Sequence, residues 1–300
     1  MLDICLLGTG GMVPLPERPL TALMAKYMGD AVLVDCGEGT QTAIRAARLG
    51  FKQISVICLT HFHADHMAGL PGLLLTIGNS GRTEPITIIG PKHVHEVVSC
   101  LLVIAQRLPF DLEFIETTPG KPLFSLGDMT IFAHAVEHWV PCYAYGFEIR
   151  RQGKFNAEKA KALGVPVKKW SFLQAGNPIQ ADEKIILPSD VMGPERKGLK
   201  LCYTTDLRPS DALADFAAGA DLFVCEGMYG DPELLENALE HKHCLFTEAA
   251  GMAARAGVKE LWLTHFSPSM PNPGDYLHFA RGIFPKSHID KRNTTLRFED

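Results

Sequence analysis

Four side chains of metal-binding type lie within six positions of the segment 57–69, "ICLTHFHADHMAG": His61, His63, Asp65 and His66. Imidazole and carboxylate groups bind zinc, and also manganese, iron or nickel. Alternation of side chains along an extended segment places His61 and His63 on the same side. Asp65 and His66 instead fit the start of a helix over "DHMAGLPGLLLTIG". The spacing therefore predicts two pairs of ligands for two neighbouring metal ions.

Two metal ions need more ligands than these four residues supply. Three apolar runs elsewhere end in a histidine or an acid, and these candidates are His138, Asp206 and His265. Less obvious candidates are His134, His241 and His243. Taken alone, each could equally be a polar residue at the edge of the core or on the surface. The tetrapeptide "LTHF" occurs at 59–62 and again at 263–266, which indicates two similar strand ends that each deliver a histidine.

The elements that must position these residues are short apolar runs bounded by turn residues. Such runs predict strands, and they read "DICLLGTGG", "DAVLVDCG", "QISVICLTH", "EPITIIGP", "MTIFAHAVEH", "YAYGFEIRR", "KLCYTTD", "ADLFVCEG" and "VKELWLTH". Helical patterns lie between some of them: "GTQTAIRAARLG", ended by Gly50, "HVHEVVSCLLVIAQRL", and "TEAAGMAARAG", with Thr247 as N-cap and Gly257 as stop. This mixture predicts sheets covered by helices.

The composition allows a large core and offers no general basic surface. The chain has 300 residues, 46% of them hydrophobic, and a formal net charge of −5. One segment departs from this balance, because residues 148–170 hold seven basic side chains against two acidic ones. Such a run is either a solvated face or a basic insertion that binds a polyanion. Trp170 beside it could stack on a base or anchor the insertion.

Eight cysteines without a C-x-x-C pair predict buried, reduced thiols and a cytoplasmic protein. No apolar run is long enough to span a membrane, and the first residues lack the pattern of a signal peptide.

Several blocks of the chain together resemble one known family. "LLGTGGMVP", "LVDCGEGTQ", "LTHFHADHMAGLPGLL" and "HCLFTEAAGMAARAGVKELWLTHFSP" are similar to motifs of the metallo-β-lactamase superfamily and, within it, of the ribonuclease Z family. The resemblance implies an α/β fold, a four-layer αβ/βα sandwich of two mixed β-sheets flanked by helices. It also implies one domain over residues 1–300, with an inserted basic arm at about 150–180.

The same resemblance assigns the ligands of two divalent ions, zinc first and manganese, iron or nickel as alternatives. It places His61, His63 and His138 on one ion and Asp65, His66 and His265 on the other, with Asp206 bridging them. Asp206 is matched through "YTTDLRP".

The implied reaction is hydrolysis of a phosphodiester. A water held between two divalent ions loses a proton near neutral pH and becomes the nucleophile, which Asp65 can orient. The resemblance makes His243 the acid that protonates the leaving 3′-oxygen, paired with Glu226. The family has H-S-T beginning at this histidine, whereas the chain reads "HCL" at 243–245.

The implied substrate is precursor transfer RNA (tRNA), from which the 3′ trailer is removed, and the implied assembly is a homodimer. The alternative is a hydrolase of a small phosphodiester, cyclic nucleotide or lactone. Two departures bear on this choice. The family's phosphate-contacting segment is "PLPERPL" here and keeps Arg18, whereas the glycine-proline motif of the arm is replaced around Lys168 and Lys169. These two lysines add phosphate-seeking charge. A non-catalytic protein with a structural metal is disfavoured, because structural zinc sites are closed and rich in sulfur.

Overall fold

The computed structural model describes residues 1–105, 107–181, 184–289 and 291–298. They form two compact units: unit 1 comprises 1–148 and 199–297, and unit 2 comprises 149–198 with 298. Among these described residues, no helix has the length and apolarity needed to cross a lipid bilayer.

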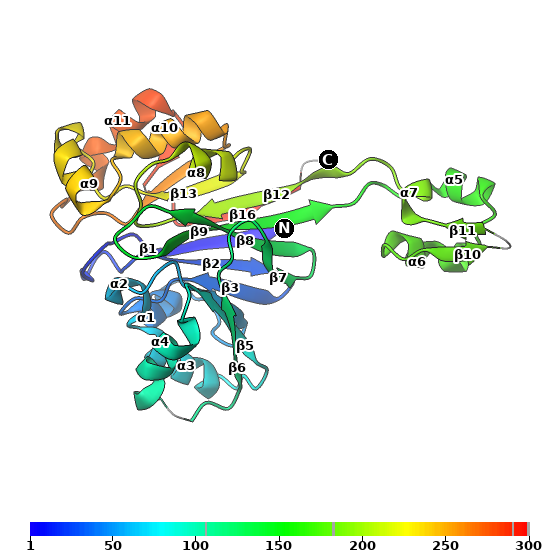
Figure 1. Cartoon of the computed structure of the whole chain (residues 1–300), viewed down its shortest axis with the longest axis horizontal. Coiled ribbons are helices and arrows are strands. Elements are labelled where there is room, and N and C mark those ends of the chain that lie inside the picture. Colours follow the sequence, from blue (N-terminus) through cyan, green and yellow to red (C-terminus); the bar gives the residue numbers. More distant parts are fainter. Residues whose placement is uncertain (106, 182–183, 290, 299–300) are drawn as a thin grey trace. The chain divides into compact units, whose positions relative to one another are not determined.

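Unit 1 contains two seven-stranded sheets (Figure 1). In spatial order the first sheet consists of β16 (Asn293–Leu296), β1 (Leu2–Gly8), β2 (Ala22–Tyr27), β3 (Asp30–Val34), β4 (Ile54–Cys58), β5 (Ile86–Gly90) and β6 (Leu112–Glu116). The second consists of β15 (Ser287–His288), β14 (Leu261–Thr264), β13 (Leu222–Glu226), β12 (Arg196–Tyr203), β9 (Cys142–Arg151), β8 (Met129–Val136) and β7 (Pro122–Leu126). Both are mixed: β3 to β6 and β12 to β15 run parallel, while β1 to β3 and the β7–β8 pair are antiparallel.

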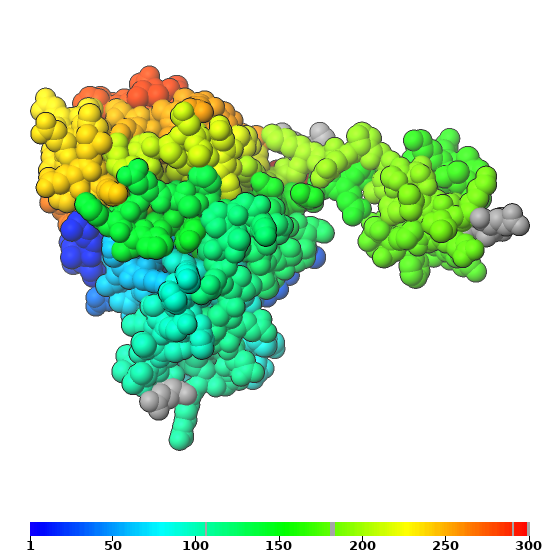
Figure 2. Space-filling model, in the orientation of Figure 1, coloured from blue at the N-terminus to red at the C-terminus, as the bar shows by residue number. Residues whose placement is uncertain are grey.

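Helices cover the outer face of each sheet (Figure 1). The first sheet carries α1 (Thr40–Ala46), α2 (Ala64–Met67), α3 (Leu70–Asn79), α4 (Val94–Leu101) and the 3₁₀ turn η1 (Leu102–Ile104). The second carries α8 (Asp211–Phe216), η3 (Pro232–Leu234), α9 (Leu235–His241), α10 (Phe246–Ala256), η4 (Pro273–Tyr276) and α11 (Leu277–Ile283). Two separate apolar clusters fill the helix–sheet interfaces, and side chains close the space between the ribbons (Figure 2). The expected four-layer sandwich is thereby confirmed.

Hydrogen bonds tie the two sheets together on their inner faces. The buried Tyr145 hydroxyl on β9 donates to the carbonyl of Leu59, just after β4, over 2.8 Å. The Thr205 hydroxyl donates to Thr60 Oγ1 over 3.2 Å. These contacts fix the end of β4 against the end of β12.

Each of the nine runs expected to be strands contains one. In unit 1 the strands β2, β6, β7, β15 and β16 were not predicted, and neither were the two strands of unit 2 described below. The sequence of β2, "ALMAKY", lacks the β-branched residues on which the prediction relied. Two predicted helix boundaries were wrong. Helix α1 ends at Ala46, well before Gly50, because the chain already turns at Arg48 with φ 57°.

The N-terminus of α10 also differs from the prediction. Leu245, not Thr247, is its N-cap, since the Glu248 carboxylate accepts the Leu245 N–H over 2.9 Å. The predicted stop at Gly257 is confirmed, with φ 61°.

Unit 2 comprises α5 (Ala157–Ala162), η2 (Val167–Lys169), α6 (Trp170–Gln174), the hairpin β10 (Ile179–Ala181) and β11 (Lys184–Ile186), and α7 (Pro188–Val191). Its small core contains Ala160, Val165, Leu173, Ile179, Ile186 and Val191, with Phe155 and Trp170 packed against it. The residues expected to form the basic arm lie in this unit.

Candidate metal centre

Four of the predicted ligands follow β4 directly. His61 lies in the extended segment after this strand, and His63 is the extended N-cap residue of α2, with φ −69° and ψ 149°. His61 Nε2 lies 3.0 Å from His63 Nδ1. Helix α2 then carries Asp65 and His66, as the sequence pattern predicted.

A glycine-containing loop presses against α2 and explains part of the surrounding motif. The Cys36 N–H donates to the carbonyl of His66 over 2.7 Å. A Cβ on Gly37 would lie 1.9 Å from the Asp65 carbonyl oxygen, and one on Gly69 would lie 2.2 Å from the Gly37 oxygen. Only glycine permits so close an approach between the loop at Gly37 and helix α2. The glycines of "DCGEG" and "MAGLPG" therefore allow the loop to fix the position of α2.

The second sheet supplies the remaining predicted ligands at the ends of its strands. Because β12, β13 and β14 are parallel, their carboxyl ends meet at one edge of the sheet. Three residues follow strands β8, β12 and β14, respectively: His138, Asp206 and His265. Each sheet therefore contributes part of one cluster.

Asp206 lies between two groups of histidines. Its Oδ1 atom is 3.1 Å from His66 Nε2 and 3.2 Å from His265 Nε2. Its Oδ2 atom is 3.6 Å from His138 Nε2 and 3.9 Å from His61 Nε2. The two carboxylate oxygens thus face different halves of the cluster, which is the geometry a bridging ligand needs.

Asp65 belongs to the half that contains His66 and His265. Its Oδ2 atom lies 3.4 Å and 3.5 Å from the Nε2 atoms of these two histidines. The same oxygen accepts the Met12 N–H over 2.8 Å. Gly11 beside it must be glycine, since a Cβ there would lie 2.7 Å from Cε1 of His265.

The unpaired atoms of this cluster fit metal ligation. Among the described residues, His138 Nε2 and Asp206 Oδ1 are buried without a hydrogen-bond partner. His66 Nε2 and His265 Nε2 lie 3.3 Å apart. Buried polar atoms are normally paired, so these atoms fit ligation of a cation in each half of the cluster. Ligand atoms of His61, His63, His138 and Asp206 lie within 4.8 Å of one another, and so do those of Asp65, His66 and His265.

The electrostatics of the half that contains Asp65, His66 and His265 favour bound positive charge. Burial disfavours protonation of His66, but Asp206 and Asp35 outweigh it and hold the pKa of His66 well above its usual value. Against the same effect of burial, Asp206, Asp65 and Glu226 raise the pKa of His265 to about 10. A field that holds a proton in a buried site also favours a divalent cation there.

Asp35 supports the cluster and was missed by the sequence reasoning. It is fully buried, follows β3 and has φ 61°. Its Oδ2 atom lies 2.9 Å from His66 Nδ1, and its Oδ1 atom accepts the Thr60 N–H over 2.8 Å. The signal was available, because "AVLVD" is an apolar run that ends in an acid.

His243 and Glu226 form a pair beside the cluster. Glu226 ends β13 and is fully buried, and its Oε1 atom lies 2.5 Å from His243 Nδ1 and 3.1 Å from His265 Nδ1. Its Oε2 atom accepts the Cys244 N–H over 2.8 Å. Burial disfavours the imidazolium, but the Glu226 carboxylate outweighs it and raises the pKa of His243.

Arg208 fixes the segment around His243 through three hydrogen bonds, and the sequence analysis did not identify this role. Arg208 Nη1 donates to the His243 carbonyl over 2.5 Å, and the guanidinium forms two further hydrogen bonds with the Glu248 carboxylate. Glu248 belongs to the first turn of α10. These hydrogen bonds therefore join "YTTDLRP" to "HCLFTEAAG", the motifs that precede and follow Glu226 in the sequence.

Of the predicted substrate residues, Arg18 belongs to unit 1, and the two lysines belong to unit 2. Arg18 donates to the carbonyls of Ser267 over 3.2 Å and Pro271 over 2.8 Å. In unit 2, Lys168 is exposed, and Lys169 Nζ donates to the carbonyl of Gln180 over 2.8 Å.

Three further sequence candidates have local roles. Trp170 Nε1 donates to the carbonyl of Val165 over 3.1 Å, which makes this tryptophan an anchor of the unit 2 core. His134 stacks on Phe216 outside the cluster. His241 lies on α9 and hydrogen-bonds the carbonyl of Asn237.

Comparison with known proteins shows which family shares this arrangement. A family model described as "Anti-Pycsar protein Apyc1" matches residues 2–109, about a third of the chain. Ribonuclease Z of Lachnoclostridium phytofermentans is 51% identical over 301 residues, covering all of this chain and 99% of that protein. The chain belongs to the ribonuclease Z family.

Other ribonuclease Z family members agree in sequence and in fold. Ribonuclease Z of Agathobacter rectalis is 50% identical over the full length of both chains. The crystal structure of the short form of human tRNase Z is 25% identical, covers 89% of this chain and 94% of that chain, and has a TM-score of 0.65.

Proposed function

We propose that this chain is a metal-dependent endoribonuclease that removes the 3′ trailer from precursor tRNA. The observation that carries the proposal is the position of the His243–Glu226 pair beside a cluster with a central carboxylate, in a chain that matches ribonuclease Z proteins from end to end. The pair supplies an acid next to the site where a nucleophile forms.

Seven residues would hold two divalent ions: His61, His63, Asp65, His66, His138, Asp206 and His265. Nitrogen and oxygen donors of this kind suit zinc. When bound, the ions supply the Lewis acidity that ionises a water near neutral pH and neutralises charge on the phosphoryl oxygens.

The chain's own residues direct the proton transfers. Asp65 is held by the Met12 N–H and can orient the attacking hydroxide, whose proton has passed to the solvent. Attack forms the new phosphorus–oxygen bond as the bond to the 3′-oxygen breaks. His243 donates its Nε2 proton to that oxygen, because Glu226 occupies Nδ1. The products are a 3′-hydroxyl on the tRNA and a 5′-phosphate on the trailer.

Unit 2 would supply charge for RNA binding. Lys154, Lys161 and Lys168 are exposed on it, and exposed lysines neutralise backbone phosphates without reading sequence. A cluster of positive charge on one unit of an acidic chain suits a large polyanion better than a small diester or lactone.

The decisive experiment incubates the purified protein with a 3′-extended precursor tRNA, beside a His66→Ala variant. We expect cleavage at the 3′ end of the mature tRNA by the wild type alone. A panel of model diesters, cyclic nucleotides and lactones is tested in parallel. Efficient hydrolysis of a panel member without precursor cleavage would refute the proposed substrate.

Three finer expectations accompany the proposal. Zinc is the expected metal, which elemental analysis of the purified protein measures. The expected assembly is a homodimer, which sedimentation equilibrium measures. The expected location is the cytoplasm, consistent with eight free thiols, seven of them buried, and fractionation of the cells tests it.

A further inference from the structure

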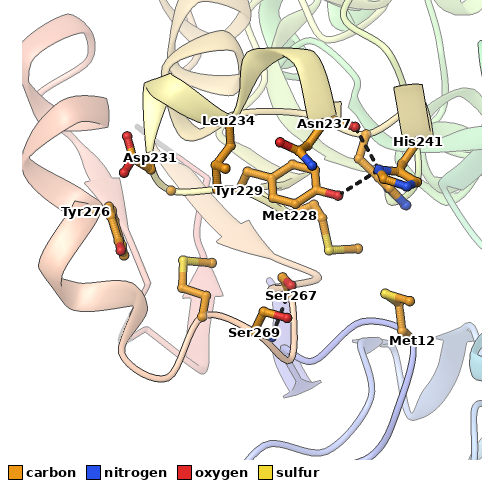
Figure 3. Close-up of a pocket in the computed structure, with 13 residues that line it drawn as sticks. Met12, Met228, Tyr229, Asp231, Leu234, Asn237, His241, Ser267, Ser269 and Tyr276 are labelled. Carbon is orange, nitrogen blue, oxygen red and sulfur yellow. Dashed lines mark hydrogen bonds between the residues drawn. The ribbon is translucent and has the colours of Figure 1, made fainter. Parts of the chain in front are cut away.

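A cavity of about 410 Å³ opens beside His243 in unit 1 (Figure 3). Tyr229, Asn237 and His241 line one side of it, and Met12, Ser267 and Ser269 line the other. Its size lies within the range of about 300–1,000 Å³ that is common for small-molecule sites. The proposed reaction uses two of its lining residues, the His243 side chain and the Met12 N–H, and leaves the rest of the lining without a role.

The walls suit an uncharged planar ring. They contain three methionines and two tyrosines, and no lysine or arginine: Met12, Met228, Met270, Tyr229 and Tyr276. Thioethers and aromatic rings make favourable contacts with flat aromatic groups. The lining also contains the Asp231 carboxylate, which repels a phosphate, and His243, which is the acid of the proposed reaction.

A few polar groups of the lining could form hydrogen bonds with the edge of such a ring. The exposed Asn237 side chain forms no hydrogen bond within the described part of the chain, so its amide can both donate and accept. Such sparse polar groups in an apolar cavity are typical of sites that discriminate between related ligands.

Specific contacts build the walls. The Tyr229 hydroxyl and His241 Nδ1 lie 3.4 Å apart. Gly230 admits Tyr276, since a Cβ on Gly230 would lie 2.4 Å from the Tyr276 Cβ. On the opposite side, Arg18 holds the loop that carries the two serines through its bonds to the carbonyls at 267 and 271. The cavity is thus shaped before any ligand arrives.

The position of the cavity assigns its ligand. His243 belongs both to the cavity wall and to the pair that protonates the leaving 3′-oxygen. The nucleoside that carries this oxygen must therefore approach from the same side. We propose that the cavity receives the base of the last nucleotide retained in the product, an inference that rests on the proposed function.

The test couples a protein side chain to the base itself. Two precursors are compared: an ordinary one, and one whose last retained nucleotide is abasic. For the wild type we expect kcat/KM to fall about ten-fold or more on the abasic precursor, within the range that base stacking contributes. Met12→Ala should lose a similar factor on the ordinary precursor and little further on the abasic one.

Met28→Ala is the matched control. Met12 and Met28 are both exposed, at 61% and 77%, and both have positive φ, at 64° and 52°. Met28 lies in the turn between β2 and β3, outside the cavity. We expect this variant to respond to the abasic change as the wild type does.

Asn237→Ala provides a second variant on an exposed helical position, where folding is least at risk. Across four precursors that differ only in the last retained base, it should reduce the spread of kcat/KM values that the wild type shows. The inference is overturned if the wild type cleaves both precursors equally well, or if Met12→Ala loses the same factor on each. If the wild type cleaves no precursor, the proposed function fails and this inference fails with it.

Discussion

Asp35 should set the metal affinity of the cluster without touching a metal. Its Oδ2 atom lies 2.9 Å from His66 Nδ1, which places the ring proton on Nδ1 and leaves the Nε2 lone pair facing Asp206. Asp35→Asn keeps the side-chain shape, and asparagine tolerates the left-handed φ of 61°. The substitution therefore changes the hydrogen bonding and little else.

The consequence follows from the number of acceptors. In the wild type, Asp35 Oδ1 accepts the Thr60 N–H over 2.8 Å, and the asparagine oxygen can keep this hydrogen bond. The amide nitrogen must then face His66 Nδ1. Two donors cannot pair, so His66 is driven to the tautomer that carries its proton on Nε2, where it cannot bind a metal. Loss of such a partner costs about ten- to hundred-fold in metal affinity, or about 1.4–2.8 kcal/mol.

The assay titrates metal-free protein with zinc in competition with a chromophoric chelator. Asp221→Asn is the matched control: Asp221 is also buried, accepts the Lys200 N–H over 2.9 Å and lies at the opposite end of β13 from Glu226. It should lower stability without changing zinc affinity. A folded Asp35→Asn protein with wild-type affinity, or an equal loss in the control, would refute the reasoning.

Three further predictions follow from the site and from unit 2. His243→Ala should lower kcat on precursor tRNA by about a hundred- to ten-thousand-fold, but much less on a p-nitrophenyl diester, whose leaving group needs no proton; equal losses would contradict the assigned role. Gly11→Ala places a Cβ 2.7 Å from the His265 ring, so purified protein should hold fewer metal ions by elemental analysis; full occupancy at wild-type affinity would contradict this. Lys161→Gln with Lys168→Gln should reduce the slope of log K against log salt for RNA binding by about 0.7–0.9 per lost phosphate contact; an unchanged slope would remove both lysines from the interface.

Local spacing made part of the metal cluster predictable. The residues from His61 to His66 lie in one strand–helix junction, so side-chain periodicity alone placed them in two pairs. His138, Asp206 and His265 could be suggested only as polar ends of apolar runs. Their convergence depends on the order of β14, β13, β12, β9 and β8 in one sheet, which brings together residues far apart in the chain.

The supporting contacts could not be predicted, because each joins distant segments. Asp35 meets His66 across 31 positions, and Arg208 meets Glu248 across 40. The misplaced N-cap of α10 has a related cause: Thr247 has the favoured side chain, but Glu248 satisfies the Leu245 N–H and the helix begins earlier. The specific hydrogen bond of Glu248 therefore decided where the helix begins, and the N-cap propensity of threonine did not.

The division of ligands between the sheets links metal binding to the packing of the sandwich. The segment after β4 and helix α2 carry His61, His63, Asp65 and His66, whereas the other three predicted ligands follow strands of the second sheet. A bound ion therefore cross-links the two sheets at the edge where Tyr145 and Thr205 already join them. Because a ligand stabilises a fold by about 2.7 kcal/mol at a hundred times its dissociation constant, a bound metal would contribute to the stability of the sandwich as well as to the proposed catalysis. The same coupling predicts that loss of an inner-face contact lowers metal affinity, since Thr205, which donates to Thr60, directly precedes Asp206.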